Sequence, residues 1–501
     1  MQRYLSVAKM IEVETASDQS GHTYHRMMAF AGRSVAEEIL IAHRQNNLKN
    51  SVLGLIGSGN NGGDALVAMN HLLTLGWTCR AYFTADRVND PLAVEFASKG
   101  GYVSSIKDDP GFHNLERLVA QEGLLLDGIL GTGIKLPLRS PVSEVLRAVQ
   151  SAIAESDNAV FVVAVDCPSG VDCDSGQAAE ESLPADLTVC LAAVKQGLLK
   201  LPAYSLLGEL VVGEIGLDPD LQVWAEINRY MIDGESARSM LAARPLDGHK
   251  GTFGKVIVIG GSEPYPGAPV LAGKAAFRSG AGWVTVAIPA GLHPHLATNF
   301  IEATWMPLPH SGSGFSQESA DAFLNHKSDS ATLLIGPGLG LLKESQDFIN
   351  ILAGRIRNSL VIDADGLKLL SNIPEWWTLL PQNSILTPHP GEMSIMSGLG
   401  VDQIQSERVE IAEKYSKLWN QVVVLKGAFT VVSEPGGKTA ILPIATPALG
   451  RAGTGDVLAG IIAGLRAQGM GSFDSACAGV WYHAQAGLLA TEKLGSTAGV
   501  L

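Results

Sequence analysis

The 501-residue sequence lacks the features that mark several classes of protein. No apolar run approaches the ~18 residues needed to cross a bilayer, and Lys9 interrupts the first apolar stretch too early for a secretory signal. The five cysteines are odd in number, scattered, and form no Cys-x-x-Cys pair. We therefore expect a cytoplasmic protein with free, buried thiols and neither a disulfide framework nor a zinc site.

Positive charge is also scarce. The chain has 36 Lys and Arg against 50 Asp and Glu, a formal net charge of −14. Surfaces that bind nucleic acid or anionic membranes carry an excess of positive charge, so neither partner is expected. A small phosphorylated ligand needs only a local positive site and stays possible. The motif G-x-x-x-x-G-K-[ST] is missing, which excludes a P-loop nucleotide site.

Glycine, in contrast, is abundant at 56 residues, and 46% of the chain is hydrophobic. Such a length predicts at least two domains. After two helices within residues 5–46, short apolar strands alternate with helical stretches, which predicts a parallel sheet covered on both faces. The alternation stops after Gly216 and resumes with a strand at 255–259, so we place the domains at 1–225 and 226–501.

Three expected strand ends in the first domain carry polar residues. They are the segments 57–64, 126–137 and 165–172, rich in Gly, Asn, Asp and Ser. The carboxyl ends of parallel strands meet at one edge of a sheet, so the three loops are expected to converge on one ligand crevice. The alternative for each loop is that its Asp or Ser only caps the next helix.

Asn61, Asp127 and Ser169, one from each loop, would provide only oxygen ligands and a single full negative charge. Such a set suits a monovalent cation better than zinc. Gly57, Gly59 and Gly62 also match the dinucleotide motif G-x-G-x-x-G, with Asp86 beyond it. A plain NAD-dependent dehydrogenase is the disfavoured alternative, because Asn60 and Asn61 put two side-chain amides into the turn.

In the second domain, Gly453 and Gly455 precede an apolar helix that we expect to begin at about Thr454. Asp456 would lie in its first turn, beside free backbone N–H groups and the positive end of the helix dipole. A carboxylate there is expected to stay ionised near neutral pH and to act as a base. With Lys426 at another strand end, these features indicate a phosphoryl-transfer site of a kind other than a P-loop.

Each part has a simpler alternative. The glycine-rich stretch could be an ordinary turn, with Asp456 only interacting with the helix dipole. His389 could be a surface residue of a proline turn, and Lys426 a solvated loop charge. Asp363 and Asp365 could be helix caps.

Taken in order, the motifs resemble those of the bifunctional NAD(P)H-hydrate repair enzymes, over nearly the whole chain. That resemblance implies an N-terminal Rossmann-like three-layer αβα domain with epimerase activity and a C-terminal ribokinase-like α/β domain with ADP- or ATP-dependent dehydratase activity. The motifs that carry it are Asn60-Asn-Gly-Gly-Asp64, Asp127-x-x-x-Gly-Thr-Gly133, Asp166-Cys-Pro-Ser-Gly170, His249-Lys-Gly251, Gly260-Gly-Ser262, Gly336-Pro-Gly-Leu-Gly340, Thr387-Pro-His-Pro-Gly-Glu392 and Gly453-Thr-Gly-Asp456.

For the first domain, the resemblance implies interconversion of the R and S forms of hydrated NADH or NADPH. Asp166 is the implied acid/base, and potassium is implied on Asn61, Asp127 and Ser169. The implied substrate residues are Asn60, Asn61, Gly62, Gly63, Asp64, Gly131, Thr132, Gly133, Ile134, Lys135, Leu136, Pro137 and Asp166.

For the second domain, the resemblance implies phosphorylation of the S hydrate by ADP, or by ATP, with magnesium, followed by loss of phosphate to give NAD(P)H. Asp456 would deprotonate the hydrate hydroxyl. The hydrate would be held by Ala268, Gly338, His389 and Asp456, and the nucleotide by Lys426, Gly427, Ala428, Phe429, Thr430, Gly453, Thr454 and Gly455. Only small-molecule substrates and a homo-oligomer are expected as partners.

The sequence departs from the family at two positions, where Ala65 and Ala452 replace the usual glycines. Arg451, next to the second departure, could add a charge near the phosphates. The alternative function is a ribokinase-like kinase for a vitamin or sugar hydroxyl, with an N-terminal nucleotide-binding module. Such a kinase would release a stable phosphorylated product.

Overall fold

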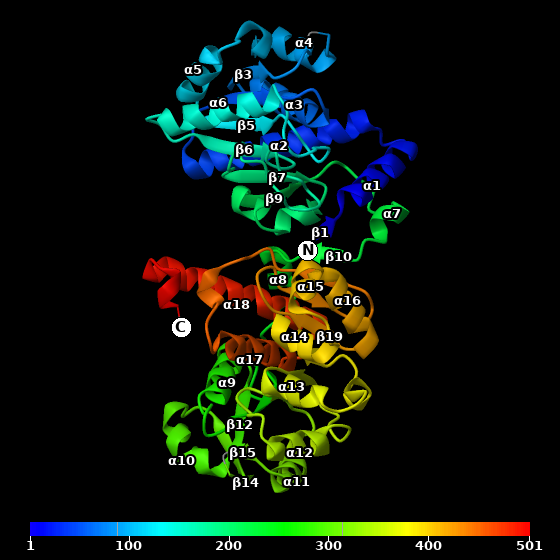
Figure 1. Cartoon of the computed structure of the whole chain (residues 1–501), viewed down its shortest axis with the longest axis vertical. Coiled ribbons are helices and arrows are strands. Elements are labelled where there is room, and N and C mark those ends of the chain that lie inside the picture. The colour runs from blue at the N-terminus through cyan, green and yellow to red at the C-terminus, as the bar shows by residue number, and fades with distance from the viewer. Residues whose placement is uncertain (88, 313, 501) are drawn as a thin grey trace. The chain divides into compact units, whose positions relative to one another are not determined.

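The computed structural model describes residues 1–87, 89–312 and 314–500. They form two compact units, Gln2–Ile227 and the chain from Asn228 onward together with Met1. In Figure 1 the first unit runs from blue into green and the second from green to red. Within the described residues, no helix has both the length and the hydropathy needed to cross a membrane.

The sheet of the first unit is parallel throughout and contains the strands expected from the sequence. Its order is β4 (Tyr102–Ser105), β3 (Thr78–Phe83), β2 (Ser51–Ile56), β5 (Leu124–Gly128), β6 (Phe161–Val165), β7 (Leu187–Leu191), β9 (Glu209–Gly213). The edge strand β4 was not predicted, because its Tyr-Val-Ser-Ser sequence shows no buried apolar pattern. A short β1 (Gln2–Leu5) pairs with β8 (Val194–Lys195), where the sequence predicted only helices from residue 5.

Two separate hydrophobic clusters flank this sheet. One includes Val35 and Leu66 from α2 and α3, and the other Leu118 and Val145 from α5 and α6. The sheet is therefore covered on both faces, and the predicted Rossmann-like three-layer fold is confirmed. The helices of this unit are α1 (Val7–Gln19), α2 (Tyr24–Asn46), α3 (Asn60–Thr74), α4 (Pro91–Ser98), α5 (His113–Gln121), α6 (Val142–Glu155) and α7 (Gln222–Ala225).

The second unit is built on a larger mixed sheet. It is parallel from β13 to β19 and antiparallel at β19–β20 and β20–β21. The order is β13 (Thr304–Leu308), β12 (Trp283–Pro289), β11 (Lys255–Ile259), β16 (Thr332–Ile335), β17 (Leu360–Ile362), β18 (Ile385–Leu386), β19 (Val422–Leu425), β20 (Val431–Ser433), β21 (Thr439–Ile441), β10 (Arg229–Met231).

Five helices of the second unit, α8, α9, α10, α17 and α18, share one apolar core with this sheet, in which Ala459 and Ile462 of α17 meet Ala272 and Ala276 of α9. These small residues allow close approach: a Cβ on Gly460 would lie 2.2 Å from the Ala272 carbonyl oxygen. The helices are α8 (Gly234–Ser239), α9 (Ala268–Arg278), α10 (His293–Leu296), α11 (Gln317–His326), α12 (Lys343–Leu352), α13 (Asp365–Ser371), α14 (Pro390–Ser397), α15 (Val401–Ser406), α16 (Arg408–Trp419), α17 (Thr454–Ala467) and α18 (Ser472–Leu494).

Candidate active sites

In the first unit, Asp166 follows β6 directly and has a left-handed backbone, with φ of 65°. Its Oδ1 accepts a hydrogen bond from the Leu191 N–H at 2.9 Å and forms an ion pair with the Lys195 ammonium. Lys195 is almost fully buried and also donates to the Leu191 carbonyl at 2.9 Å. Both of these Asp166 contacts use Oδ1 and neither uses Oδ2.

Two further carboxyl groups lie in the electrostatic field of this pair. Burial raises the pKa of Asp64 well above its usual value, and the charges of Asp166 and Glu14 add to the rise. Burial also raises the pKa of Glu14. Burial alone would lower the pKa of Lys195, but the Asp166 carboxylate reverses the effect and the pKa is raised. The site thus pairs an ammonium-bound carboxylate, Asp166, with a carboxyl group, Asp64, that favours its neutral form.

The predicted cation ligands are joined by one chain of hydrogen bonds. The Ser169 hydroxyl donates to Asp127 Oδ1 at 2.6 Å and accepts from the Leu130 N–H at 2.9 Å. The Asn61 side-chain amide donates to the Leu130 carbonyl at 2.9 Å. Asp127 is fully buried, and burial raises its pKa although hydrogen bonds from Ser169 and Ile129 oppose this. Oxygen donors around one costly buried charge fit a monovalent cation.

The remaining predicted substrate residues of this unit lie beside these groups. Residues 60–64 begin α3, and a Cβ added to Gly131 would lie 3.4 Å from the Asn61 Cβ. Residues 131–137 form a partly exposed loop, with Lys135 directed to the surface. Ala65, at the first departure from the family pattern, is buried against Gly128. A Cβ added to Gly128 would lie 2.6 Å from the Ala65 Cβ, so position 128 has room only for glycine.

In the second unit, Asp456 lies in the first turn of α17, which begins after Gly453 with φ of 92°. The pKa of Asp456 is raised to about 7, first by burial and next by the charge of Asp363, while Lys426 opposes the shift. The expectation of a carboxylate fully ionised near neutral pH is therefore wrong. Desolvation and the neighbouring carboxylates outweigh the helix dipole and the single ammonium.

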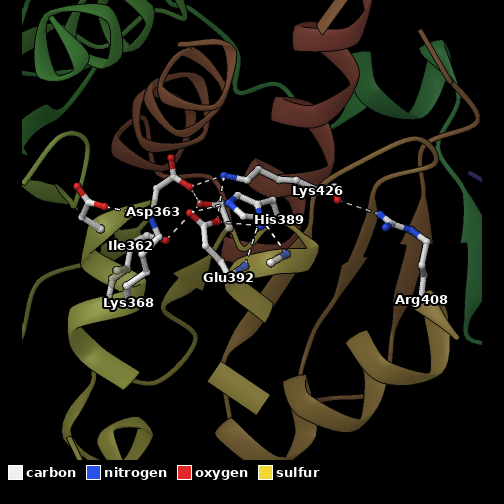
Figure 2. Close-up of polar contacts among 10 residues, drawn as sticks. Ile362, Asp363, Lys368, His389, Glu392, Arg408 and Lys426 are labelled. Atoms are coloured by element: carbon white, nitrogen blue, oxygen red, sulfur yellow. Dashed lines mark hydrogen bonds and ion pairs between the residues drawn. The ribbon is translucent and has the colours of Figure 1, made fainter. Parts of the chain in front are cut away.

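Lys426 follows β19 and is buried against acidic groups (Figure 2). Its Nζ lies 2.6 Å from Asp363 Oδ1 and 3.8 Å from Glu392 Oε2. Asp363 also accepts a hydrogen bond from the Thr387 hydroxyl at 2.7 Å. Burial favours a neutral Lys426, but the two carboxylates raise its pKa, so it remains an ammonium. Lys426 is thus no solvated loop charge, and Asp363 is no helix cap.

His389 caps the N-terminus of α14. Its ring Nδ1 accepts hydrogen bonds from the backbone N–H groups of Gly391 at 3.0 Å and Glu392 at 3.3 Å. The backbone N–H of His389 donates to Glu392 Oε2 at 2.9 Å. Burial lowers its pKa. A neutral ring whose Nδ1 accepts carries its proton on Nε2, and in the half-exposed His389 side chain this Nε2 lies 3.3 Å from Glu392 Oε1.

Ala268 and Gly338 adjoin each other at the start of α9. Gly338 has φ of 65°, and a Cβ on it would lie 3.0 Å from the Ala268 Cβ. The same loop is fixed by hydrogen bonds from the Ser262 hydroxyl to the Gly338 carbonyl and from the Gly340 N–H to Asp365 Oδ2, at 2.8 and 3.0 Å. Asp365 therefore anchors this loop.

A cavity of 420 Å³ brings most of the predicted nucleotide residues together, namely Lys426, Gly427, Ala428, Thr430, Thr454 and Gly455, with His389 at its edge. Phe429, Gly453 and Asp456 are not among its lining residues. Leu442, Ile444, Leu449 and Val480 give the cavity apolar walls. His483 of α18 also lines it, and burial lowers the pKa of this histidine to about 4. Sequence reasoning missed these five residues, because no motif marks them.

Arg451 also lines this cavity, but its guanidinium is engaged elsewhere. Its Nη1 donates to the carbonyls of Ala498 and Val500, both at 2.8 Å. The hypothesis of an added charge for the phosphates is therefore not supported by the geometry. Arg451 instead ties the turn before α17 to residues close to the end of the chain.

In comparisons with known proteins, each of the two units matches a different family. A family described as NAD(P)H-hydrate dehydratase matches residues 256–500, and one described as YjeF-related protein N-terminus matches residues 24–197. The bifunctional NAD(P)H-hydrate repair enzyme Nnr of Moorella thermoacetica is 36% identical, over 94% of this chain and 89% of its own length. The enzyme of the same name from Thermofilum pendens is 31% identical, over 98% and 93%.

Among solved structures, the ADP/ATP-dependent NAD(P)H-hydrate dehydratase of Bacillus subtilis, co-crystallized with ATP/Mg2+, is 28% identical, with a TM-score of 0.47, over 55% of this chain and 94% of that one. The fold is that of a two-part α/β enzyme, a Rossmann-like unit followed by a ribokinase-like unit. The chain belongs to the family of bifunctional NAD(P)H-hydrate repair enzymes.

Proposed function

We propose that the chain restores hydrated NADH and NADPH to the reduced cofactors. Its Rossmann-like unit would equilibrate the R and S hydrates, and its ribokinase-like unit would dehydrate the S hydrate with consumption of ADP, or of ATP. The observation that carries this proposal is the position of Asp456. It lies in the first turn of α17, next to a 420 Å³ cavity that is also lined by the buried Lys426, and its pKa is raised to about 7 by burial. The test is recovery of reduced nicotinamide from the hydrates in the presence of ADP or ATP.

The dehydration is difficult because hydroxide is a poor leaving group at neutral pH, whereas phosphate is a good one. Asp456 takes the proton of the hydrate hydroxyl, and the resulting oxygen attacks the terminal phosphoryl group of the nucleotide, releasing AMP or ADP. The ring nitrogen then supplies the electrons that expel phosphate. Loss of a proton from the neighbouring carbon restores the double bond of NAD(P)H.

The surrounding groups stabilise charge on the transferring phosphoryl group. The backbone N–H groups at Gly453–Gly455 begin α17, and their partial positive charge favours an anion there. Ala268, Gly338 and His389 would hold the hydrate on the side of Asp456. Among the described residues, no group of three His, Cys, Asp or Glu side chains is arranged to hold a metal. Magnesium bound to the nucleotide would neutralise part of the charge of its phosphates.

Epimerisation occurs at a carbon that bears a hydroxyl and is bonded to the ring nitrogen. Asp166, through Oδ2, removes the hydroxyl proton as the bond from carbon to nitrogen opens, and neutral Asp64 protonates the nitrogen. Closure on the opposite face of the resulting aldehyde reverses these transfers and gives the other epimer. The two carboxyl groups suit these roles because Asp166 is paired with the Lys195 ammonium, whereas burial raises the pKa of Asp64.

The pH dependence of dehydration follows from Asp456. The base reacts in its ionised form and its pKa is raised to about 7, so kcat/KM for the S hydrate should fall as the pH drops through about 7 and level off above it. Stopped-flow measurements of nicotinamide recovery at saturating nucleotide check this. An acid limb that lies below about pH 5, the range of an unperturbed carboxyl group, would contradict the role of Asp456.

Potassium is proposed on Asn61, Asp127 and Ser169, where the donor set suits it. When potassium is replaced by tetramethylammonium at constant ionic strength, epimerisation should slow by about tenfold or more and recover on adding potassium back. The variant Ser169→Ala should need more potassium for half-maximal rate. Wild-type epimerisation that proceeds equally fast in both salts would remove the cation from the account.

A further inference from the structure

The proposed epimerase leaves one cavity of the first unit without a role. It has a volume of 470 Å³ and lies between the end of β3, α4 and the segment of β4 that leads into Ile106–Asp108. Phe83, Ala93 and Val103 give it apolar walls, and its rim carries Asp86, Arg87 and Lys107. It lies beside the turn between β2 and α3, where Asn60 and Asn61 belong to the proposed substrate site, because Arg87 contacts that turn.

Arg87 spans the distance from the cavity to this turn. Its Nε forms an ion pair with Asp90 Oδ2 at 2.9 Å, and its Nη2 donates to the Gly59 carbonyl at 3.2 Å. Its Nη1 is buried and has no hydrogen-bond partner within the described part of the chain. A buried guanidinium N–H without a partner is costly, so this atom points to an anionic group that is bound during function.

The position of that nitrogen defines where the anion would lie. A Cβ on Gly62 would be 2.9 Å from Arg87 Nη1 and 2.3 Å from the Gly57 carbonyl oxygen. Nη1 is therefore over the first turn of α3, whose cap residue Gly59 offers no side chain to its N–H groups. The N-terminus of a helix and a guanidinium group each favour a phosphate, and here the two are neighbours.

The rim of the cavity carries the second element of a nucleoside site. Asp86 follows β3, the strand next to β2 in the sheet, and forms an ion pair with Lys107. In doubly wound folds a carboxylate at the end of this second strand accepts hydrogen bonds from ribose hydroxyls. Asp90 and Asp108 also border the region, so its carboxylates outnumber its cations, which disfavours a phosphorylated ribose.

We infer that this cavity binds the adenosine half of the hydrated dinucleotide, with Arg87 on its diphosphate and Asp86 on its ribose hydroxyls. The inference rests on the proposed epimerase function and adds a substrate preference to it. An unphosphorylated ribose fits the acidic rim, so the epimerase site favours hydrated NADH over hydrated NADPH. The nicotinamide half of the same molecule would then be bound near Asp166, which follows β6, and Asp64, which lies in α3.

The test is the KM of epimerisation, measured on the full chain without ADP or ATP so that no dehydration occurs. The variant Arg87→Gln should raise KM for both hydrates by about tenfold, because it removes a charged contact to the diphosphate. The variant Asp86→Ala should raise KM for hydrated NADH by about tenfold and lower KM for hydrated NADPH. Arg33→Gln, on the exposed surface of α2, is the matched control and should change neither.

Dehydration of the S hydrate belongs to the other unit and should stay at the wild-type rate in the same variants, whereas persistence of epimerisation shows that the first unit is folded. If Arg87→Gln does not fold, Arg87→Lys, which keeps the charge near Asp90, and Asp86→Ala decide the question. A KM that stays within about twofold for both hydrates in Arg87→Gln and Asp86→Ala would overturn the adenosine site while epimerisation itself persists. Absence of epimerisation in the wild-type chain would instead overturn the proposed function.

Discussion

Replacing Asp456 by Asn is expected to lower kcat for dehydration by about 10²–10⁴-fold, the loss typical of a missing general base. The amide has nearly the shape of the carboxyl group, so the turn after Gly453 and the first N–H groups of α17 should be preserved. Nucleotide affinity should therefore change little, because the 420 Å³ cavity is lined by other residues. Removing one negative charge near the phosphates could only strengthen that binding.

The chain contains its own control for this variant. Epimerisation would take place in the other unit and should proceed at the wild-type rate in Asp456→Asn, while unchanged nucleotide affinity shows that the second unit is folded. Asp402→Asn, an exposed first-turn carboxylate of α15, is the matched substitution and should leave both activities intact. An equal loss of nucleotide binding and of dehydration would show that Asp456 is structural.

The variant Asp166→Asn should have the opposite pattern, with epimerisation slowed by about 10²–10⁴-fold and dehydration of pure S hydrate unchanged. An amide cannot accept the hydroxyl proton, although it can keep the hydrogen bond from the Leu191 N–H. Chromatographic separation of the R and S hydrates over time measures the exchange rate. Exchange at the wild-type rate would mean that the first unit only binds the hydrate or recruits it for the second.

Lys195 offers a second test of the same centre, as a positioning residue. In Lys195→Met the buried Asp166 carboxylate loses its ion-pair partner, so kcat for epimerisation should fall, whereas Lys195→Arg, which keeps the positive charge, should restore part of it. A loss of stability alone would lower the melting temperature of both variants without this difference in kcat. A kcat that stays at the wild-type value in Lys195→Met would show that Lys195 supports the fold but not the chemistry.

The fold was largely predictable because its strands are short, apolar and regularly alternated with helices. The strands at 51–56, 124–128 and 187–191 are buried on both faces, so continuous apolar runs mark them. The edge strand β4 escaped prediction because Tyr102 and Val103 are exposed there. Pairing of β1 with β8 depends on residues far apart in the chain, and no local pattern reveals such a contact.

Candidate site residues could be proposed from the sequence where glycines and strand ends gather polar residues. The residues that contact them from distant parts of the chain could not. Asp166 and Asp456 belong to motifs, but Lys195, Arg87 and His483 do not, and each becomes visible only by its burial next to a motif residue. The protonation of Asp456 could not be derived from its place on α17. Its pKa depends on Asp363 and Lys426, which reach it from other strands.

The most direct test of the whole account is incubation of a mixture of R and S hydrated NADH with the protein, ADP or ATP, and magnesium, followed by the absorbance of reduced nicotinamide. The account predicts full recovery by the wild-type chain. In Asp166→Asn only the S fraction should recover quickly, and in Asp456→Asn almost none. The contradicting result is no recovery by the wild-type chain with either nucleotide, or accumulation of a stable phosphorylated product, as the alternative kinase would give.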